Sequence, residues 1–518
     1  FLTRLLFLYF GHPSITHDEA DYFLNSYLLT KTGTDILNQK FFLTSGILYA
    51  TSAISVYLGS LIFHFFEKSV IVARFPFALL NSFTPVLFYL ILNKLTKNKT
   101  FSLIGFTIFN FSPWFSYLSS QSAFDSPISL LFYLASFYIL LTKIKLIYKN
   151  ILFFIFSFFS FNSYMGIKTS FPFLIFTALI AKTILQKNKI NLKVLIKNFL
   201  VSCSLFLVLF TFSYFSPSSQ HFIGRLKEKL LPFNIKSISN KVTYERSITS
   251  NQNLVKNLLF NKVTAFATLF SEKYIQAFNP YFLFVKGDQH VIYGTNYLGL
   301  FYLFDFIFLM AGFYFATRIF SKNQLVVLPF FLLFVAGAIP IGMTIDTPNI
   351  SIRGYPLIVA YVFFISAGAY YLLKKFSLNF LLYLAAFIFF FSLFQVVIKN
   401  TSANQWHLTE KNLSQKLKNL KEKSNKKKIV VYVNEPRETL LLYLFYQENN
   451  PLLIKRSILS KNYSIGNLSF SPICPQEKIN NFIQIIHSER CPINTDVFKP
   501  VVFIPPENNL SSSYFLLK

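Results

Sequence analysis

Long apolar runs recur along most of this chain and constrain its fold more than any other feature. Ten of them have, or nearly have, the roughly 20 residues that an α-helix needs to cross a bilayer. With 68 Phe among 518 residues and a mean hydropathy of +0.47, the chain is more apolar than soluble proteins are. We therefore expect a polytopic, mainly α-helical membrane protein with spans near residues 70–92, 101–118, 126–142, 150–165, 169–185, 198–215, 297–316, 325–343, 354–373 and 378–398.

The distribution of charge predicts the topology. Residues 1–10 look like the end of an eleventh span, which we expect to start before Phe1, and the apolar segment 41–66 is rich in Ser and Thr. If 41–66 is an interfacial or re-entrant helix, the connectors on one side carry basic residues and no acidic ones, as cytoplasmic loops do. The basic residues of these connectors are Lys94, Lys97, Lys99, Lys143, Lys145, Lys149, Lys182, Lys187, Lys189, Lys193, Lys197, Arg318, Lys322, Lys374 and Lys375.

This placement explains the formal charge of +28 without a nucleic-acid partner. We expect a membrane domain over residues 1–398, located in the plasma membrane, with the loops 11–69 and 216–296 on the outer face. An amphipathic helix over 254–278 would lie on the membrane surface.

Residues 399–518 lose the long apolar runs, and we expect a small extracytoplasmic α/β domain there. Strands are predicted at 429–433, 483–486 and 501–504, and a helix at 439–446. Cys474 and Cys491 both fall in this domain, where a disulfide is chemically permitted. The sequence leaves open whether they are bridged.

The run Thr16-His17-Asp18-Glu19 is the leading candidate for chemistry. An acidic pair beside a histidine at a membrane edge can provide a general base. The same run is also a capping box that would start a helix through about Thr30, with Thr16 as N-cap and Glu19 at N3. Asp21 and Asn25 would share a polar face with Asp18, and we expect His17 and Asp21 to line the site.

Other candidates also have structural alternatives. Asp125 either caps the helix that follows it or supplies a second carboxylate. Lys168, Arg353 and Arg74 either extend toward the interface or bind a phosphate, for which the guanidinium of Arg353 is best suited. Asp305 would be costly inside a span unless it extends to the interface or pairs.

Cofactor signals are weak. The spacing offers no local metal signature, and a divalent-metal site would have to combine separate loops, for example His17 with His290. We therefore assign no metal ligands and no cofactor from the sequence, and a divalent metal stays an open alternative. The sequence contains no phosphate-binding glycine-rich loop and no nucleophile elbow, which argues against soluble nucleotides as donors.

Several short motifs together resemble the GT-C fold membrane glycosyltransferases of the protein O-mannosyltransferase and aminoarabinose-transferase type, also described as glycosyltransferase family 39-like. The resemblance covers most of the chain. The motifs are His12-Pro13-Ser14-Ile15-Thr16-His17-Asp18-Glu19-Ala20, Arg74-Phe75-Pro76-Phe77-Ala78-Leu79, Ser112-Pro113-Trp114 with Ala123-Phe124-Asp125, Phe284 to Asp288, Ala338 to Pro340, Arg353 to Pro356, Ile429 to Val433 and Tyr443 to Tyr446.

This resemblance implies transfer of a sugar from a polyprenyl-phosphate carrier to a protein, lipid or glycan acceptor on the outer face. Asp18 matches the catalytic base, and Glu19 completes the acidic pair. Asp288 and His290, in the second outer loop, are further candidates to line the site. Relatives often carry a Lys-Pro-Pro-Leu-Tyr-like stretch, where this chain has Leu43-Thr44-Ser45-Gly46-Ile47-Leu48-Tyr49. Without that lysine, Arg353 or Lys168 must do more of the phosphate binding, or the donor differs. We hypothesise a single inverting displacement.

Two other classes of function compete with this one. A transporter or lipid flippase commonly shows internal repeats and a binding site at the midplane, whereas the candidate residues here lie at the outer edge. An assembly scaffold without chemistry would tolerate the loss of Asp18.

Overall fold

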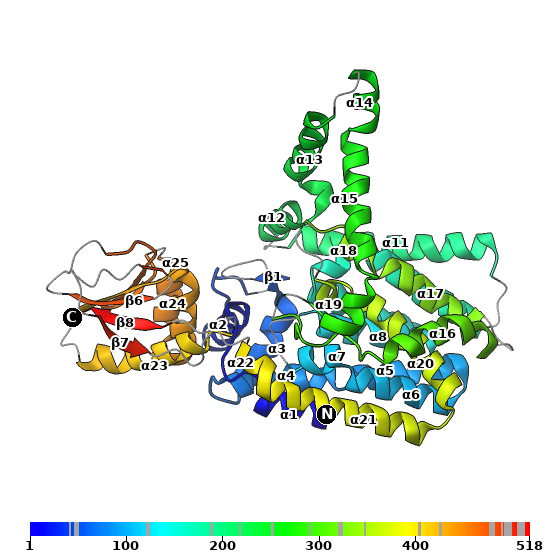
Figure 1. The fold of residues 1–518 in the computed structure, drawn as a ribbon, viewed down its shortest axis with the longest axis horizontal. Helices are drawn as coiled ribbons and strands as arrows, with labels where there is room; N and C mark the ends of the chain where they lie inside the picture. Colours follow the sequence, from blue (N-terminus) through cyan, green and yellow to red (C-terminus); the bar gives the residue numbers. More distant parts are fainter. Residues whose placement is uncertain are drawn as a thin grey trace.

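The computed structural model confirms a mainly helical chain with a small C-terminal sheet (Figure 1). It describes residues 1–40, 43–45, 51–120, 125–186, 190–216, 219–249, 253–288, 290, 292–319, 325–345, 349–401, 406–423, 427–460, 462–475, 482–487, 490–491, 500–504 and 513–517. Residues 46–49 of the first-loop motif, Ala123, Phe124, Lys187, Lys189 and Lys322 lie outside these ranges.

The apolar runs form one helical body. A short antiparallel pair, β1 (Thr44–Ser45) and β2 (Thr51–Ser52), lies in the first loop. The helices are α1 (Leu2–Phe10), α2 (His17–Thr32), α3 (Ala53–Phe63), α4 (Val70–Asn81), α5 (Thr84–Thr96), α6 (Lys99–Phe111), α7 (Pro113–Leu118), α8 (Asp125–Leu141), α9 (Leu146–Ser163), η1 (Gly166–Thr169), α10 (Phe171–Leu185), α11 (Leu192–Tyr214), η3 (Phe282–Lys286), α16 (Asp305–Ile319), α17 (Val327–Ala336), α18 (Ile339–Gly342), α19 (Ile350–Arg353), α20 (Tyr355–Leu373), α21 (Phe376–Leu393), η5 (Phe394–Ile398) and α22 (Lys399–Thr401).

Within the described residues, five helical stretches are long and apolar enough to cross a membrane. They are Val70–Thr96, Leu146–Ser163, Leu192–Tyr214, Tyr355–Leu373 and Phe376–Ile398. Exposed apolar side chains along α11, such as Leu200, Leu207 and Phe212, suit contact with lipid. Shorter apolar helices occupy other predicted spans, including Asp125–Leu141 and Phe171–Leu185. The total number of spans stays a prediction.

Several predicted segments are divided or shortened in the structure. The run 101–118 is divided at Ser112, whose side chain caps α7 just before Pro113. The run 297–316 becomes helical only at Asp305. The predicted helix over 254–278 is two helices, because the Asn261 side chain accepts from the backbone N–H groups of Val263 and Thr264 and starts a second one.

Asp305 is buried and paired rather than extended to the interface. The Tyr383 hydroxyl donates to Asp305 Oδ1, and the Tyr302 backbone N–H donates to Oδ2 at 2.9 Å. These partners reduce the cost of placing a carboxyl group among apolar helices.

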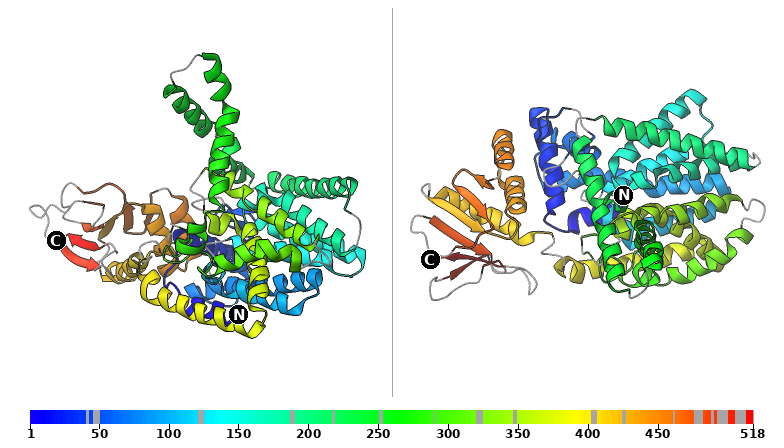
Figure 2. Two further views of the ribbon diagram at one scale, coloured as in Figure 1. Left: turned by 45° about the vertical axis from the view of Figure 1, so that its right-hand side comes forward. Right: turned by 90° about the horizontal axis from the view of Figure 1, so that it is seen from above.

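The helices α12 (Ser219–Lys229), α13 (Ile235–Ser247), α14 (Asn253–Leu259) and α15 (Lys262–Gln276) project from the body (Figures 1 and 2). A short turn, η2 (Leu231–Phe233), joins α12 to α13. Their base is fixed to the body where the Lys273 ammonium donates to the Thr344 carbonyl at 2.7 Å.

The C-terminal region is a six-stranded sheet with three helices. Its helices are α23 (Leu408–Lys423), α24 (Pro436–Gln447) and α25 (Pro451–Leu459), and its strands are β3 (Lys428–Tyr432), β4 (Ser464–Ile465), β5 (Leu468–Ser471), β6 (Phe482–His487), β7 (Pro500–Ile504) and β8 (Tyr514–Leu517). The strand order is β4-β5-β3-β6-β8-β7, with β5, β3 and β6 parallel. All three predicted strands and the predicted helix are present. A disulfide joins Cys474 to Cys491.

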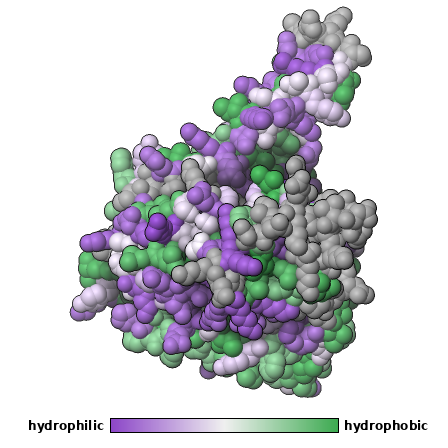
Figure 3. Space-filling model, turned by 90° about the vertical axis from the view of Figure 1, so that its left-hand side faces the viewer, coloured by the Kyte–Doolittle hydropathy of each residue, from purple (hydrophilic) through white to green (hydrophobic). Residues whose placement is uncertain are grey.

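This C-terminal region docks on α2. The ring of Phe23 lies 5.7 Å from that of Phe445 on α24, and the Tyr27 hydroxyl donates to the Asn449 carbonyl at 2.8 Å. Side chains of α2 and α24 belong to one buried apolar cluster. Viewed from this end, much of the molecular surface is hydrophilic (Figure 3). The predicted boundary at residues 398 and 399 stays a prediction.

Two glycines allow α16 and α20 to cross closely. A Cβ atom on Gly312 would lie 1.8 Å from the Phe364 carbonyl oxygen, and one on Gly368 would lie 1.8 Å from the Phe308 carbonyl oxygen. Small residues at such crossings are typical of helices packed in a membrane.

We expect Gly312→Ala to destabilise the protein by about 1–3 kcal/mol, because the added methyl group must push two helix backbones apart. Thermal unfolding in detergent measures the effect. Gly224→Ala on α12 is the matched control, since a Cβ there has nothing within 4 Å. A Gly312→Ala protein with the same melting temperature as the wild type would contradict the close crossing of α16 and α20.

Candidate functional site

The site is organised by the first turn of α2. The Thr16 hydroxyl accepts from the Glu19 backbone N–H at 3.1 Å, and the Glu19 carboxylate accepts from the Thr16 N–H at 3.3 Å. This confirms the predicted capping box. His17 and Asp18 keep 23% and 26% of their side chains exposed, whereas Glu19 is fully buried. Of the acidic pair, Asp18 is therefore the residue that a substrate can reach.

Glu19 forms a buried ion pair with Arg74 of α4. Arg74 Nε lies 2.8 Å from Glu19 Oε1, and Arg74 Nη2 lies 2.6 Å from Glu19 Oε2. The two parallel bonds are the strong, directional form of an Arg–carboxylate contact. Sequence reasoning placed Glu19 among the catalytic residues and Arg74 among the phosphate ligands, but the structure directs these two groups toward each other.

The same guanidinium also holds the first loop. Arg74 Nη1 donates to the His12 carbonyl and Nη2 to the Ser14 carbonyl, each at 2.7 Å. The Trp406 ring lies 5.1 Å from Arg74 Cζ and stacks on the His12 ring at 4.3 Å. Arg74 therefore fixes the chain that leads into His17 and Asp18.

Asp125 reaches the site from the first residue of α8. The Tyr22 hydroxyl donates to Asp125 Oδ2 at 2.6 Å, and the Ser55 hydroxyl donates to Oδ1. The side chain is 7% exposed. Asp125 thus joins α8 to α2 and α3, a role that neither the predicted N-cap nor a free second carboxylate describes.

The chain between η3 and α16 supplies another wall. The Ser351 hydroxyl donates to Asp288 Oδ2 at 2.7 Å, and Arg353 Nη1 donates to the Thr344 hydroxyl at 2.9 Å. Burial raises the pKa of Asp288 to about 6, against the opposing effects of the Ser351 hydrogen bond and the Arg353 charge. Asp288 and Arg353 are therefore near neighbours.

The carboxylate of Asp18 is near enough to both walls for its charge to act on them. Its charge interacts with Asp125 of α8 and with Tyr293. Burial lowers the pKa of His290, the charge of His17 lowers it further, and that of Asp18 opposes both. The structure thus brings His17, Asp18, Asp125, His290 and, through Tyr293, Arg353 into one neighbourhood.

Lys168 and Asp21 occupy more buried positions. Lys168 lies in η1, which packs against α10 and α18, and its ammonium is 4.6 Å from the centre of the Phe161 ring. Burial lowers the pKa of Lys168 to about 7. Asp21 is 1% exposed and accepts from the Asn25 side chain at 2.8 Å. Asp21 therefore supports α2 from within, although sequence reasoning placed it among possible lining residues.

Sequence reasoning missed five contributors, namely Tyr22, Ser55, Tyr293, Ser351 and His407. Tyr22 had a usable signal, because it lies four residues after Asp18 on the same helix face. His407 Nε2 lies 3.5 Å from His17 Nδ1, although the two residues are 390 positions apart in the sequence. Contacts of that kind have no local pattern.

No protein-family model matches the chain, and no curated protein matches it. Among solved structures, the chain is similar to the archaeal oligosaccharyltransferase AglB from Archaeoglobus fulgidus, in complex with an inhibitory peptide and a dolichol-phosphate. That alignment has a TM-score of 0.46 and 14% identity, and it covers 86% of this chain and 63% of the AglB chain.

The chain is also similar to ArnT from Cupriavidus metallidurans bound to undecaprenyl phosphate, with a TM-score of 0.43 and 10% identity over 99% of this chain and 96% of that chain. The likeness to the same protein in the apo state has a TM-score of 0.39 and 10% identity, with the same coverage. AglB and ArnT are GT-C glycosyltransferases, the type of protein that the sequence motifs resemble.

We expect Glu19→Gln to destabilise the protein by about 3–5 kcal/mol, because it leaves the Arg74 charge buried without its partner. Thermal and denaturant unfolding in detergent measure the loss. The control is Glu245→Gln, which breaks a partly exposed pair with Lys241 at 3.5 Å and should cost at most about 1 kcal/mol. Equal losses in the two variants would show that Glu19 does not anchor the first loop.

Proposed function

We propose that this protein is an integral-membrane glycosyltransferase that moves a sugar from a polyprenyl-phosphate carrier to an acceptor on the outer face of the plasma membrane. The observation that carries the proposal is the accessible carboxylate of Asp18, which directly precedes Glu19 of the buried Glu19–Arg74 ion pair and whose charge acts on Asp125, His290 and Tyr293. The motif run from His12 to Ala20, which resembles GT-C glycosyltransferases, contains this carboxylate.

Asp18 is the general base of the proposed reaction. Its carboxylate takes the proton of an acceptor hydroxyl, and the hydroxyl oxygen attacks the anomeric carbon of the sugar. The bond between that carbon and the carrier phosphate oxygen breaks, and the electron pair leaves with the polyprenyl phosphate. A single displacement of this kind inverts the anomeric configuration.

Asp125 is a positioning residue in this scheme. It holds the Tyr22 hydroxyl at 2.6 Å, and Tyr22 lies one helical turn after Asp18. The contact therefore fixes the rotation of α2 about its axis and, with it, the direction of the base. Such positioning matters because a misplaced catalytic group lowers the rate steeply.

Arg353 and Lys168 are the proposed cations for the carrier phosphate. The leaving group develops negative charge as the bond breaks, so fixed cations stabilise the transition state. Arg353 stands at the end of α19, close enough to Asp288 and Tyr293 for its charge to act on both. This proposal replaces Arg74, whose nitrogens bind Glu19 and the first loop.

Turnover with polyprenyl-phosphate sugars tests the proposal. We expect Asp18→Asn to lower turnover by at least about 100-fold while donor binding persists, because the variant loses the proton acceptor and keeps the shape of the side chain. Glu67→Gln, which changes an exposed carboxylate of the same loop, is the control. The anomeric configuration of the product tests inversion.

Equal turnover in wild type and Asp18→Asn would move the base to another residue. A product with retained configuration would exclude a single displacement. If purified protein in lipid turned over no donor of the panel, yet moved a carrier between leaflets, the flippase alternative would replace the enzyme.

The affinity for the donor should depend on the charge of Lys168. Because burial lowers its pKa to about 7, the ammonium is protonated below that pH and loses its charge as the pH rises. We therefore expect donor affinity to fall between about pH 6 and 9. In Lys168→Arg the guanidinium stays protonated, and this decline should disappear. The affinity of each protein for a polyprenyl-phosphate sugar is measured across this pH range, in which the phosphodiester of the donor keeps its charge. Identical pH profiles in the wild type and in Lys168→Arg would show that Lys168 does not bind the donor.

A further inference from the structure

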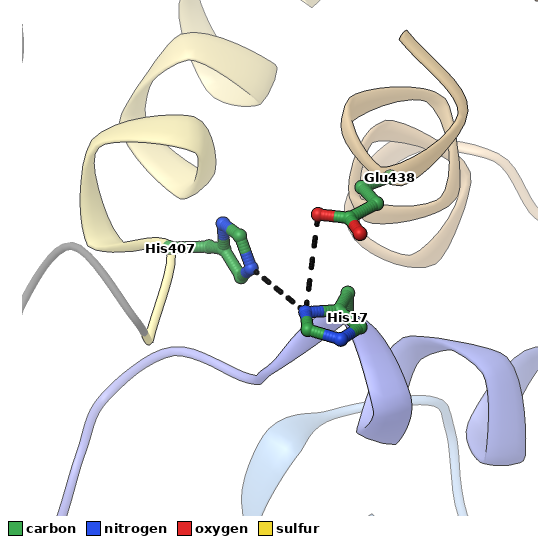
Figure 4. A group of neighbouring side chains, drawn as sticks. All are labelled: His17, His407 and Glu438. Carbon is green, nitrogen blue, oxygen red and sulfur yellow. Dashed lines mark hydrogen bonds and ion pairs between the residues drawn. The ribbon is translucent and has the colours of Figure 1, made fainter. Parts of the chain in front are cut away.

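Three potential metal ligands meet between the first loop and the C-terminal region (Figure 4). His17 begins α2, His407 precedes α23, and Glu438 lies in the first turn of α24. His407 Nε2 is 3.5 Å from His17 Nδ1, and Glu438 Oε2 is 3.8 Å from that same nitrogen. All three side chains are partly buried, with exposed fractions of 23%, 16% and 20%.

These separations fit one small cation. Ligand atoms about 2.0–2.2 Å from a tetrahedral ion lie roughly 3.3–3.6 Å from one another. The two separations from His17 Nδ1, 3.5 Å and 3.8 Å, are near this spacing, and all three ligand atoms lie within 4.8 Å of one another. Two imidazoles and one carboxylate, with a fourth position left to water, make up a ligand set that zinc proteins use.

The outer nitrogens of the two imidazoles also have suitable partners. Asp18 Oδ1 lies 3.6 Å from His17 Nε2, and Glu410 Oε2 lies 3.7 Å from His407 Nδ1. A histidine that binds a metal commonly directs its other ring nitrogen to a carboxylate, which fixes the ring and its tautomer. Both histidines of this cluster have that arrangement, and each carboxylate belongs to a different element from Glu438.

The backbone at His407 gives independent support. This residue has φ +49°, in the left-handed region that side chains rarely adopt, and the Ser14 hydroxyl holds its carbonyl oxygen at 3.1 Å. Strained backbone of this kind persists where the surroundings enforce it and is common at functional sites. Here it turns the imidazole of His407 toward His17 (Figure 4).

We propose that His17, His407 and Glu438 bind a divalent transition-metal ion of the Zn²⁺ type, which ties the C-terminal region to the start of α2. Nitrogen ligands favour Zn²⁺ over Mg²⁺ or Ca²⁺, which prefer oxygen. The ion closes a contact between segments 390 residues apart. Because Asp18 follows a ligand directly and faces its outer nitrogen, the bound ion also restrains the direction of Asp18. The metal site stands whether or not the protein transfers sugars.

The test uses the full-length protein in detergent, without an affinity tag, stripped with a chelator and titrated with Zn²⁺ against a chelating dye. We expect one Zn²⁺ per chain. Affinity should fall by at least about 100-fold in His407→Ala and by about 10–100-fold in Glu410→Gln, which removes only the carboxylate behind His407. The exposed His64 provides the control variant His64→Ala, which should bind as the wild type does.

A second measurement does not need the alanine variant to fold. Zn²⁺ should raise the melting temperature of the wild type and of His64→Ala, because a ligand that binds only the folded state stabilises it. It should leave Glu438→Gln, a partly exposed change on α24, unshifted. Absence of stoichiometric Zn²⁺, or equal affinity and equal shifts in the ligand variants and in His64→Ala, would overturn the proposal.

Discussion

The buried pair of Glu19 and Arg74 is the interaction on which the rest of the site depends. It lies below the first turn of α2, and the same guanidinium holds the carbonyl groups of His12 and Ser14. Charges without water around them are stable only when they are paired and hydrogen-bonded. This requirement leaves little freedom for the loop between α1 and α2. Asp18 can remain accessible because the buried ion pair is made by its neighbour Glu19.

The carboxylates of this site therefore have different roles. Glu19 and Asp125 are buried and fully occupied by Arg74, Tyr22 and Ser55, so they define where α2 lies and how it is rotated. Asp18 alone of these three keeps an exposed surface. Acidic residues that look equivalent in a motif therefore differ in burial, and burial decides which of them can meet a substrate.

Local patterns made much of the fold predictable. The run Thr16 to Glu19 predicted the start of α2, and the β-branched run Ile429 to Val433 predicted β3 within one residue at each end. Hydropathy could not show that residues 297–304 precede α16 rather than belong to it, because burial in a loop selects apolar residues too. The candidate site was predicted in part. Asp18, Asp125 and Arg353 were found from motifs, but the partners Ser351 and His407 come together only through tertiary packing.

The docking of the C-terminal region on α2 also has a consequence in time. Tyr27 and its partner Asn449 are separated by 422 residues, and at about 5–20 residues per second the ribosome needs roughly 20–80 s to synthesise that interval. Until then the part of α2 that packs on α24 lacks that partner, although Phe23 also contacts Phe63 of α3, with ring centroids 6.4 Å apart. The contact between α2 and α24 can therefore form only after the intervening membrane helices have been synthesised.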